Sequence, residues 1–216
     1  MLLSNLLIET QARLGTSVKT RLTTPKQTFA LNTVRKRLLL EYDIANFIKE
    51  DDITITSGDG TLPTDYIRTT KELDKSGKEK TLWLTSNDDE IYKKVSIERF
   101  DDNIDRTWAT KQDTAGATFS IYEAGTDTYT MRYYFMPDNM SDSADDSGLP
   151  IHFDEIHPLL AARQLLFDDR QFESAAQLKA EADRLLSAHF KNQRMDGGAK
   201  RTSSFHSGLL GSVFIA

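Results

Sequence analysis

The sequence contains no cysteine among its 216 residues, which excludes disulfides, thiolate zinc sites, iron–sulfur clusters and cysteine nucleophiles. It also lacks any apolar run close to the roughly 18 residues that span a bilayer. The first residues, Met1-Leu2-Leu3-Ser4-Asn5, lack the basic start of a secretory signal. We therefore expect no membrane segment, and assembly inside the cell.

Motifs with a defined chemistry are also missing. The four histidines show no H-E-x-x-H spacing, so we expect no metal site; they are His152, His157, His189 and His206. Gly58-Asp59-Gly60 does not continue as a dinucleotide-binding loop, and there is no phosphate-binding loop or nucleophile elbow. Asp101, Asn103 and Asp105 imitate the first ligands of a calcium loop, but Arg106 replaces its glycine and Gln112 its glutamate.

Paired aspartates are the remaining candidates for catalysis, and their positions favour a structural role. They occur at positions 51/52, 88/89, 101/102, 145/146 and 168/169, where we expect element boundaries. Acidic pairs at such places cap helices or solvate turns. The sequence thus predicts no enzyme and no cofactor. The hydrophobic content of 38% and the mean hydropathy of −0.49 are low for a compact enzyme, although well above those of a disordered chain.

The charge is distributed unevenly along the chain. Residues 1–40 contain seven basic residues against Glu9 alone, a net +6; because the whole chain has a net charge of −6, residues 41–216 carry −12. This asymmetry suits subunits that meet positive to negative. We therefore expect Arg35, Lys36 and Arg37 on a helix surface between subunits. Nucleic-acid binding is the alternative, although no aromatic residues alternate with the basic ones.

Two helices are predicted at the start of the chain. The first covers residues 4–14, with Leu3, Leu7 and Leu14 on one stripe and Gly15 as its end. The second begins with Thr24 as a cap, Pro25 at the first helical position and Gln27 completing a capping box. Its apolar spacing extends to Glu50.

Residues 51–137 are predicted to form an antiparallel β module that exposes one face. Strands are expected at residues 53–55, 66–70, 81–85, 118–122 and 129–134, with a short helix at residues 90–99. Residues 138–150 form an acidic linker. Two further helices are predicted at residues 154–167 and 171–192, the second with a stripe of Ala175, Leu178, Ala182 and Leu185; His189 continues that stripe as a packing residue.

The expected fold is therefore α+β: a helical bundle formed by N- and C-terminal helices (residues 1–50 and 151–193), with the β module inserted between them. Residues 194–216 form an extended, flexible tail rich in glycine and serine. Because an apolar end on a polar tether is suited to docking on a partner, we expect the tail to bind one. The predicted docking residues are Arg201, Phe205, Leu209, Leu210, Val213, Phe214 and Ile215.

The order of elements and three short motifs resemble a known family. The motifs are Leu62-Pro63-Thr64-Asp65-Tyr66, the run from Tyr129 to Met136-Pro137, and Leu149-Pro150-Ile151-His152-Phe153 followed by His157-Pro158-Leu159-Leu160. Together they resemble the head-to-tail connector proteins of tailed bacteriophages, also called adaptor or head-completion proteins. The resemblance covers most of residues 1–193.

The resemblance implies a structural virion protein in the neck of the particle. It implies a dodecameric ring below the portal protein, contacts with tail or nozzle proteins, a channel through which phage DNA passes without specific binding, and a C-terminal tail that reaches the portal. A stopper or other tail-completion ring protein is an alternative, as is a nucleic-acid-binding module that uses the basic N-terminal helices.

Overall fold

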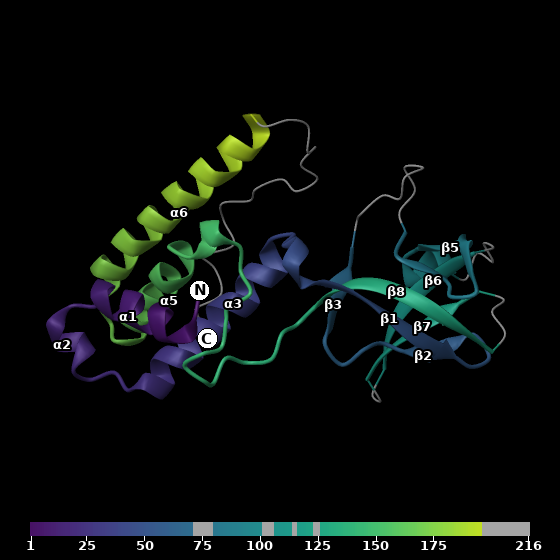
Figure 1. Ribbon diagram of the computed structural model, residues 1–216, viewed down its shortest axis with the longest axis horizontal. Coiled ribbons are helices and arrows are strands. Elements are labelled where there is room, and N and C mark those ends of the chain that lie inside the picture. Colours follow the sequence, from purple (N-terminus) through teal and green to yellow (C-terminus); the bar gives the residue numbers. More distant parts are fainter. Residues whose placement is uncertain (71–79, 101–105, 114–115, 123–125, 196–216) are drawn as a thin grey trace.

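The structure is a computed structural model that describes residues 1–70, 80–100, 106–113, 116–122 and 126–195 (Figure 1). Helices gather at one end of the molecule and strands at the other. The helices are α1 (Leu3–Arg13), α2 (Thr16–Lys19), α3 (Thr24–Glu41), α4 (Ile97–Phe100), α5 (Ile156–Asp168) and α6 (Phe172–Met195), with 3₁₀ turns η1 (Ala45–Phe47) and η2 (Ile151–Phe153). The strands are β1 (Ile48–Ile55), β2 (Asp59–Thr61), β3 (Tyr66–Thr69), β4 (Leu82–Leu84), β5 (Asn87–Lys94), β6 (Thr107–Asp113), β7 (Gly116–Ile121) and β8 (Asp127–Phe135). The expected combination of helices and β-structure is confirmed.

One hydrophobic core lies among α1, α3, α5 and α6. Helix α5 packs against each of the other three helices, and its buried residues surround the whole helix rather than one stripe. Helix α1 contributes Leu3 and Leu6 to this core, and Arg13 bonds to Glu9 one turn back (2.6 Å) on its outer side. From α6, Ala175, Ala182 and Leu186 are buried, so the predicted stripe faces this core.

Helix α3 differs from its prediction at both ends. Gln27 does not form a capping box, because its side chain is buried between helices: it donates to the Leu22 carbonyl (3.2 Å) and accepts from Gln11 of α1 (3.1 Å). At the other end the helix stops at Glu41 instead of continuing to Glu50. Ala45 and Ile48 continue the helical spacing in the sequence, but Ala45 lies in η1 and Ile48 begins β1.

The strands form one eight-stranded sheet in the order β1-β8-β4-β5-β6-β7-β2, with β3 also pairing with β8. The two end strands, β1 and β2, are consecutive in the chain and are joined by the turn at Ser57 and Gly58, both at positive φ. The sheet therefore curls until its ends meet and nearly closes into a barrel. A second hydrophobic core fills its interior, with Trp108, Phe119, Met131 and Tyr133 almost fully buried.

Two predictions for the β module were wrong. The sheet is not purely antiparallel, because β5 and β6 pair in parallel. The helix predicted at residues 90–99 is largely strand β5, and only Ile97–Phe100 is helical. The cause is non-local: β5 forms a hairpin with β4, and Tyr92 enters the barrel core edge-on to Tyr129, with the ring centroids 5.3 Å apart. Strands β2 and β6 had no predicted counterpart.

Residues 138–150, predicted as an acidic linker, are a strap fastened to the helices. The amide and carbonyl of Met140 bond reciprocally to the Asn32 side chain of α3 (2.9 Å each). The backbone of Asp145 accepts from the Leu3 amide (2.8 Å), and its carboxylate accepts from the amides of Ser141 and Asp142. Gly148 has a φ of +68° and lies so near Phe47 that a Cβ would be 2.8 Å from the ring.

Arg35 of α3 is 3% exposed, which corrects its assignment to a surface between subunits. Its guanidinium points under the strap and donates to the carbonyls of Asp138 and Ser147 and to Asn32 Oδ1. Burial lowers the pKa of Arg35, and the carboxylates of Asp145 and Asp138 oppose that shift. Lys36 and Arg37, the other two residues of the predicted surface, are partly exposed.

His157, the second residue of α5, is fully buried. Its Nε2 donates to the Leu31 carbonyl of α3 (2.8 Å), and Nδ1 has no partner within the described chain. Burial lowers the pKa of His157 to about 4, and the nearby Arg35 charge acts in the same direction. The imidazole is therefore neutral at pH 7 and serves as a link between two helices.

The Arg35→Met variant is expected to lower the free energy of unfolding by about 2–4 kcal/mol, because it leaves strap carbonyls buried without a donor. Lys36→Met removes a neighbouring cation that is partly exposed, and should change stability by less than about 0.5 kcal/mol. Urea denaturation of the two variants measures the difference. Equal losses would show that Arg35 does not hold the strap.

Stability should decrease by about 3 kcal/mol as the pH falls from 7 to 4, through His157 alone. In that window the unfolded histidine binds a proton and the buried one does not, so acid favours unfolding. Burial raises the pKa of Glu41 and Asp168, which therefore act in the opposite direction. Both groups remain in His157→Gln, so the difference between the two proteins isolates the histidine. Parallel pH profiles from denaturation would contradict this assignment.

Candidate functional site

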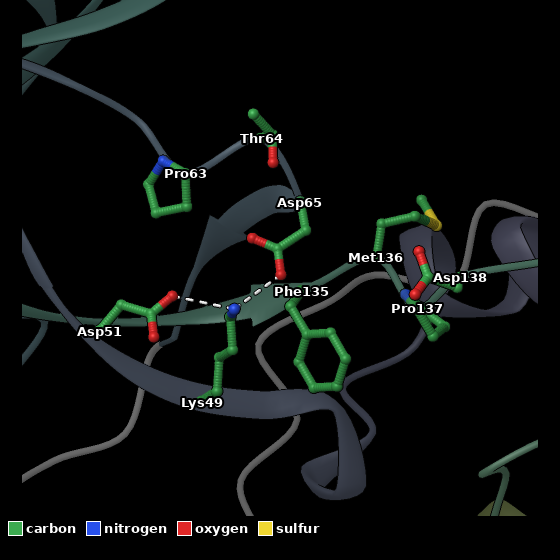
Figure 2. Close-up of a pocket in the computed structure, with 9 residues that line it drawn as sticks. All are labelled: Lys49, Asp51, Pro63, Thr64, Asp65, Phe135, Met136, Pro137 and Asp138. Atoms are coloured by element: carbon green, nitrogen blue, oxygen red, sulfur yellow. Dashed lines mark ion pairs between the residues drawn. The ribbon is translucent and has the colours of Figure 1, made fainter.

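A pocket of about 410 Å³ lies where the helices meet the barrel (Figure 2). Three parts of the chain line it: the start of β1, the loop before β3, and the end of β8 with the first strap residues. The lining residues are Lys49, Asp51, Pro63, Thr64, Asp65, Phe135, Met136, Pro137 and Asp138. Two of the sequence motifs that carry the family resemblance therefore meet here, and the Met136 amide donates to the Asp65 carbonyl (2.7 Å).

Strand alternation places the charged side chains in this pocket. In β1, Ile53 and Ile55 face the barrel interior, and the same face includes Lys49 and Asp51 nearer the helices. Lys49 is paired with Tyr133 in the register of β1 and β8. One inward-facing row thus changes from apolar to charged as it reaches the mouth of the barrel.

Four polar side chains form a connected cluster at this mouth. The Lys49 Nζ lies 2.9 Å from Asp51 Oδ2 and 2.7 Å from Asp65 Oδ2. The Tyr133 hydroxyl lies 2.6 Å from Asp51 Oδ2 and 2.9 Å from Asp65 Oδ1, so its single hydrogen can be donated to either carboxylate. Each carboxylate therefore lies within hydrogen-bond distance of both the ammonium and the phenol, and the cluster joins β1, β8 and the loop before β3.

The pKa values of three groups in this cluster, Lys49, Asp51 and Tyr133, move away from neutrality. Hydrogen bonds to Asp65 and Asp51 raise the pKa of Lys49, while bonds from Tyr133 and Lys49 lower the pKa of Asp51. Burial, followed by the bond to Asp51, raises the pKa of Tyr133. All these groups keep one protonation state near pH 7, which suits a structural lock and not proton transfer.

Arg68 of β3 makes a second connection between the two halves. It donates to the Leu40 carbonyl (2.7 Å), the Tyr42 carbonyl (2.8 Å) and Asp43 Oδ1 (2.9 Å), all at the end of α3. The last turn of α3 contains no basic residue of its own. The cation that a helix C-terminus favours is thus supplied by the barrel, and it stacks 4.7 Å from the Tyr134 ring centroid.

The arrangement of these side chains provides a pocket and joins the helices to the barrel, and it shows no group of residues suited to a chemical reaction. Within the described part of the chain, no group of three or more His, Cys, Asp or Glu side chains could hold a metal ion. His152 contacts the Phe153 ring and His157 is a buried link between helices. Among the described helices, none has the length and apolar composition needed to cross a membrane.

Several predicted sites lie outside the described residues. They include the calcium-like run at residues 101–105, His206, and every predicted docking residue of the tail. Of the aspartate pairs, Asp51 and Asp52 lie inside β1 and not at a boundary, because β1 begins at Ile48. Asp145 does support a turn, as predicted, and Asp169 forms an ion pair with Arg21 (2.8 Å).

Sequence reasoning missed Lys49 and Arg68 altogether. Lys49 was assigned to the helix that was predicted to extend to Glu50. In a helix, residues 49 and 51 do not share a face, so their spacing was not recognised as a strand pattern. Asp65 and Tyr133 stood inside the motifs used for the resemblance, but nothing in a single sequence pairs residues so far apart. The alternation of Lys49, Asp51, Ile53 and Ile55 was the available signal.

Replacing Lys49 by Met should lower the free energy of unfolding by about 1–2 kcal/mol at pH 7, because Asp51 and Asp65 then lose the cation between them. The loss should shrink as the pH falls through the lowered pKa of Asp51, because a protonated carboxyl no longer pairs with the cation. Denaturation at pH 7 and pH 3 measures both effects. Lys93→Met, at an exposed position of β5, is the matched control and should be neutral; an equal loss in both variants would refute the role of the cluster.

The sequence was also compared with known proteins. No curated protein matches it. The sequence model of the SU10 adaptor protein family, a family of phage head-to-tail adaptors, matches residues 1–204. That match covers both groups of helices, the barrel, the junction pocket and the strap, and it bears out the resemblance drawn from the three motifs. The chain belongs to the SU10 adaptor protein family.

Proposed function

We propose that this adaptor forms a ring in the neck of a phage particle, between the portal protein and tail or nozzle proteins, with a channel for DNA. The family match over residues 1–204 carries this proposal, because it spans every described element. The ring is expected to be dodecameric and to assemble in the host cytoplasm. Its role is structural, and no catalysis or cofactor is involved.

The distribution of exposed apolar side chains supports assembly through the helices. Eight large hydrophobic residues are exposed in the described chain, and only Ile97 belongs to the barrel half. The other seven lie in or beside the helices and strap: Leu2, Ile8, Phe29, Leu40, Ile151, Phe167 and Phe172. Most of the exposed apolar side chains available to a partner are thus in the helical half.

The charge distribution supports a channel that does not hold DNA tightly. Residues 41–216 have a net charge of −12, and an acidic wall lets a polyanion slide where a basic wall would bind it with counterion release. Arg35 is buried under the strap, so the Arg35-Lys36-Arg37 run offers few contacts to phosphate. This observation argues against the alternative of a nucleic-acid-binding module.

The proposed division of labour follows the predicted segments. We assign subunit packing to the helices of residues 1–50 and 151–193 acting as one bundle, with the β module of residues 51–137 inserted between them. We assign residues 138–150 to fastening the β module to the helical bundle. The tail, residues 194–216, is assigned to the portal.

The tail energetics favour collective docking. Burial of Leu209, Leu210, Val213, Phe214 and Ile215 would contribute roughly 8–15 kcal/mol in total. Ordering their backbone costs about 1–2 kcal/mol per residue, so a single tail is near balance. Many tails in one ring raise the effective concentration of each, which makes the ring and not the single chain the binding unit.

Deletion of residues 202–216 tests the role of the tail. The shortened chain should keep the circular dichroism spectrum and melting temperature of the full chain, because the described cores end before residue 202. It should fail to sediment with DNA-filled heads that carry the portal, whereas the full chain joins them. Normal joining by the folded, shortened chain would refute the assignment of the tail.

A further inference from the structure

The outer side of α3 presents an exposed stripe of apolar and basic residues. Lys26, Phe29, Thr33, Lys36 and Leu40 follow one another at steps of three and four, so they share one face of the helix. Phe29 is 69% exposed and Leu40 55% exposed, while Leu31, Val34 and Leu38 on the other side are buried. The Thr33 hydroxyl donates to the Phe29 carbonyl (2.8 Å) and so needs no outside partner.

The first half of α6 presents a surface of the opposite charge. Helix α6 packs chiefly on α5, and Ala175 and Ala182 point into that contact. The exposed residues of its first turns are Phe172, Glu173, Ser174, Ala176, Gln177, Ala180 and Glu181, of which only the two glutamates are charged. Phe172 is 56% exposed and lies against Phe167, with the ring centroids 5.1 Å apart. Arg184, one turn further on, ends this acidic surface.

The two surfaces match in charge, size and spacing. In α3, Lys26 and Lys36 stand about 15 Å apart along the axis with Phe29 between them. In α6, Glu173 and Glu181 stand about 12 Å apart, with exposed Ala176, Gln177 and Ala180 between them. A surface that carries a large ring between two cations could thus meet one that carries small side chains between two carboxylates.

We propose that the α3 stripe of one copy docks on the α6 surface of a second copy. This inference rests on the proposed function and names the contact through which the ring would form. Both surfaces are exposed in the single chain, and α5 packs against both helices, so a second copy can use the free side of each. A contact between two different patches repeats from copy to copy and closes into a ring where the rotation allows it.

The chemistry of the stripe favours a second copy over DNA. Phosphate backbones would pair with Lys26 and Lys36 but offer no apolar surface to Phe29 and Leu40. The charged pairs at the rim contribute little affinity by themselves, and they fix the partner and its orientation. The apolar centre, Phe29 against Ala176 and Ala180, supplies the attraction.

Cysteine cross-linking tests this contact directly, because the chain contains no cysteine. Phe29→Cys is mixed with Ala176→Cys or with Ala180→Cys on portal-bearing heads that lack this chain, under mild oxidation. We expect covalent dimers in at least one mixture, and none with Phe29→Cys or either alanine variant alone. Phe29→Cys mixed with Thr54→Cys, an exposed position on the barrel strand β1, is the control.

Charge exchange provides an independent test that needs no cross-link. Lys26→Glu and Glu173→Lys should each slow ring formation on heads by about tenfold, through the loss of charge steering. The chain that carries both substitutions should recover most of the rate. The melting temperature of each free variant shows that the fold is intact.

The outcomes separate this inference from the proposed function. If the full chain does not join heads, both are refuted. If it joins but the α3–α6 mixtures cross-link no more than the control, the ring uses another surface and only the inference fails. Cross-linking of Phe29→Cys to the portal, or to itself in a symmetric dimer, would also overturn it, as would a double charge variant that remains slow.

Discussion

The junction between two hydrophobic cores is the constraint on which this structure depends. Within the described residues, the chain passes between helices and barrel through the segment from Tyr42 to Phe47 and through the strap, so covalent connections alone leave the halves free to turn. Phe135 limits that freedom because it packs against both cores. Lys49 with Asp51 and Asp65 closes the barrel mouth beside it, and Arg68 holds the end of α3. The polar contacts at the junction fix the orientation of the helical half relative to the barrel, which hydrophobic burial alone does not determine.

The strap shows why composition misled the prediction. Four aspartates in thirteen residues are typical of a solvated linker. In the folded chain, however, Asp145 uses its carboxylate to satisfy two backbone amides of its own turn, and Asn32 and Arg35 satisfy strap carbonyls from beneath. The segment is ordered because its backbone groups have partners on α3, and those partners lie about a hundred positions away in the sequence. Periodicity cannot reveal such a contact.

Features that depend on local sequence patterns could be predicted, and features that depend on contacts between distant residues could not. Helices α1, α5 and α6 and strands β3, β4, β7 and β8 follow from local apolar spacing and turn residues, and their prediction was accurate. Segment 90–99 was predicted as a helix because its local pattern is ambiguous, and pairing with β4 decided the outcome. The junction cluster was missed for a similar reason. Lys49 was assigned to the predicted helix, and only its pairing with Tyr133 in the sheet shows that it lies at the barrel mouth. Residues whose role depends on a partner in another element are those that a single sequence leaves undetermined.

Helix α3 connects the junction to the proposed contact between copies. Its inner face holds the strap through Arg35 and Asn32, its end is fixed to the barrel by Arg68, and its outer face carries Phe29 and Lys36. This helix of 18 residues is thus held to the strap and to the barrel at separate points along its length. The direction in which its outer stripe points is then set by the barrel, so any partner that turns the barrel also turns the surface offered to the next copy. In the proposed ring, such a link would couple the side that meets the portal to the side that meets the tail.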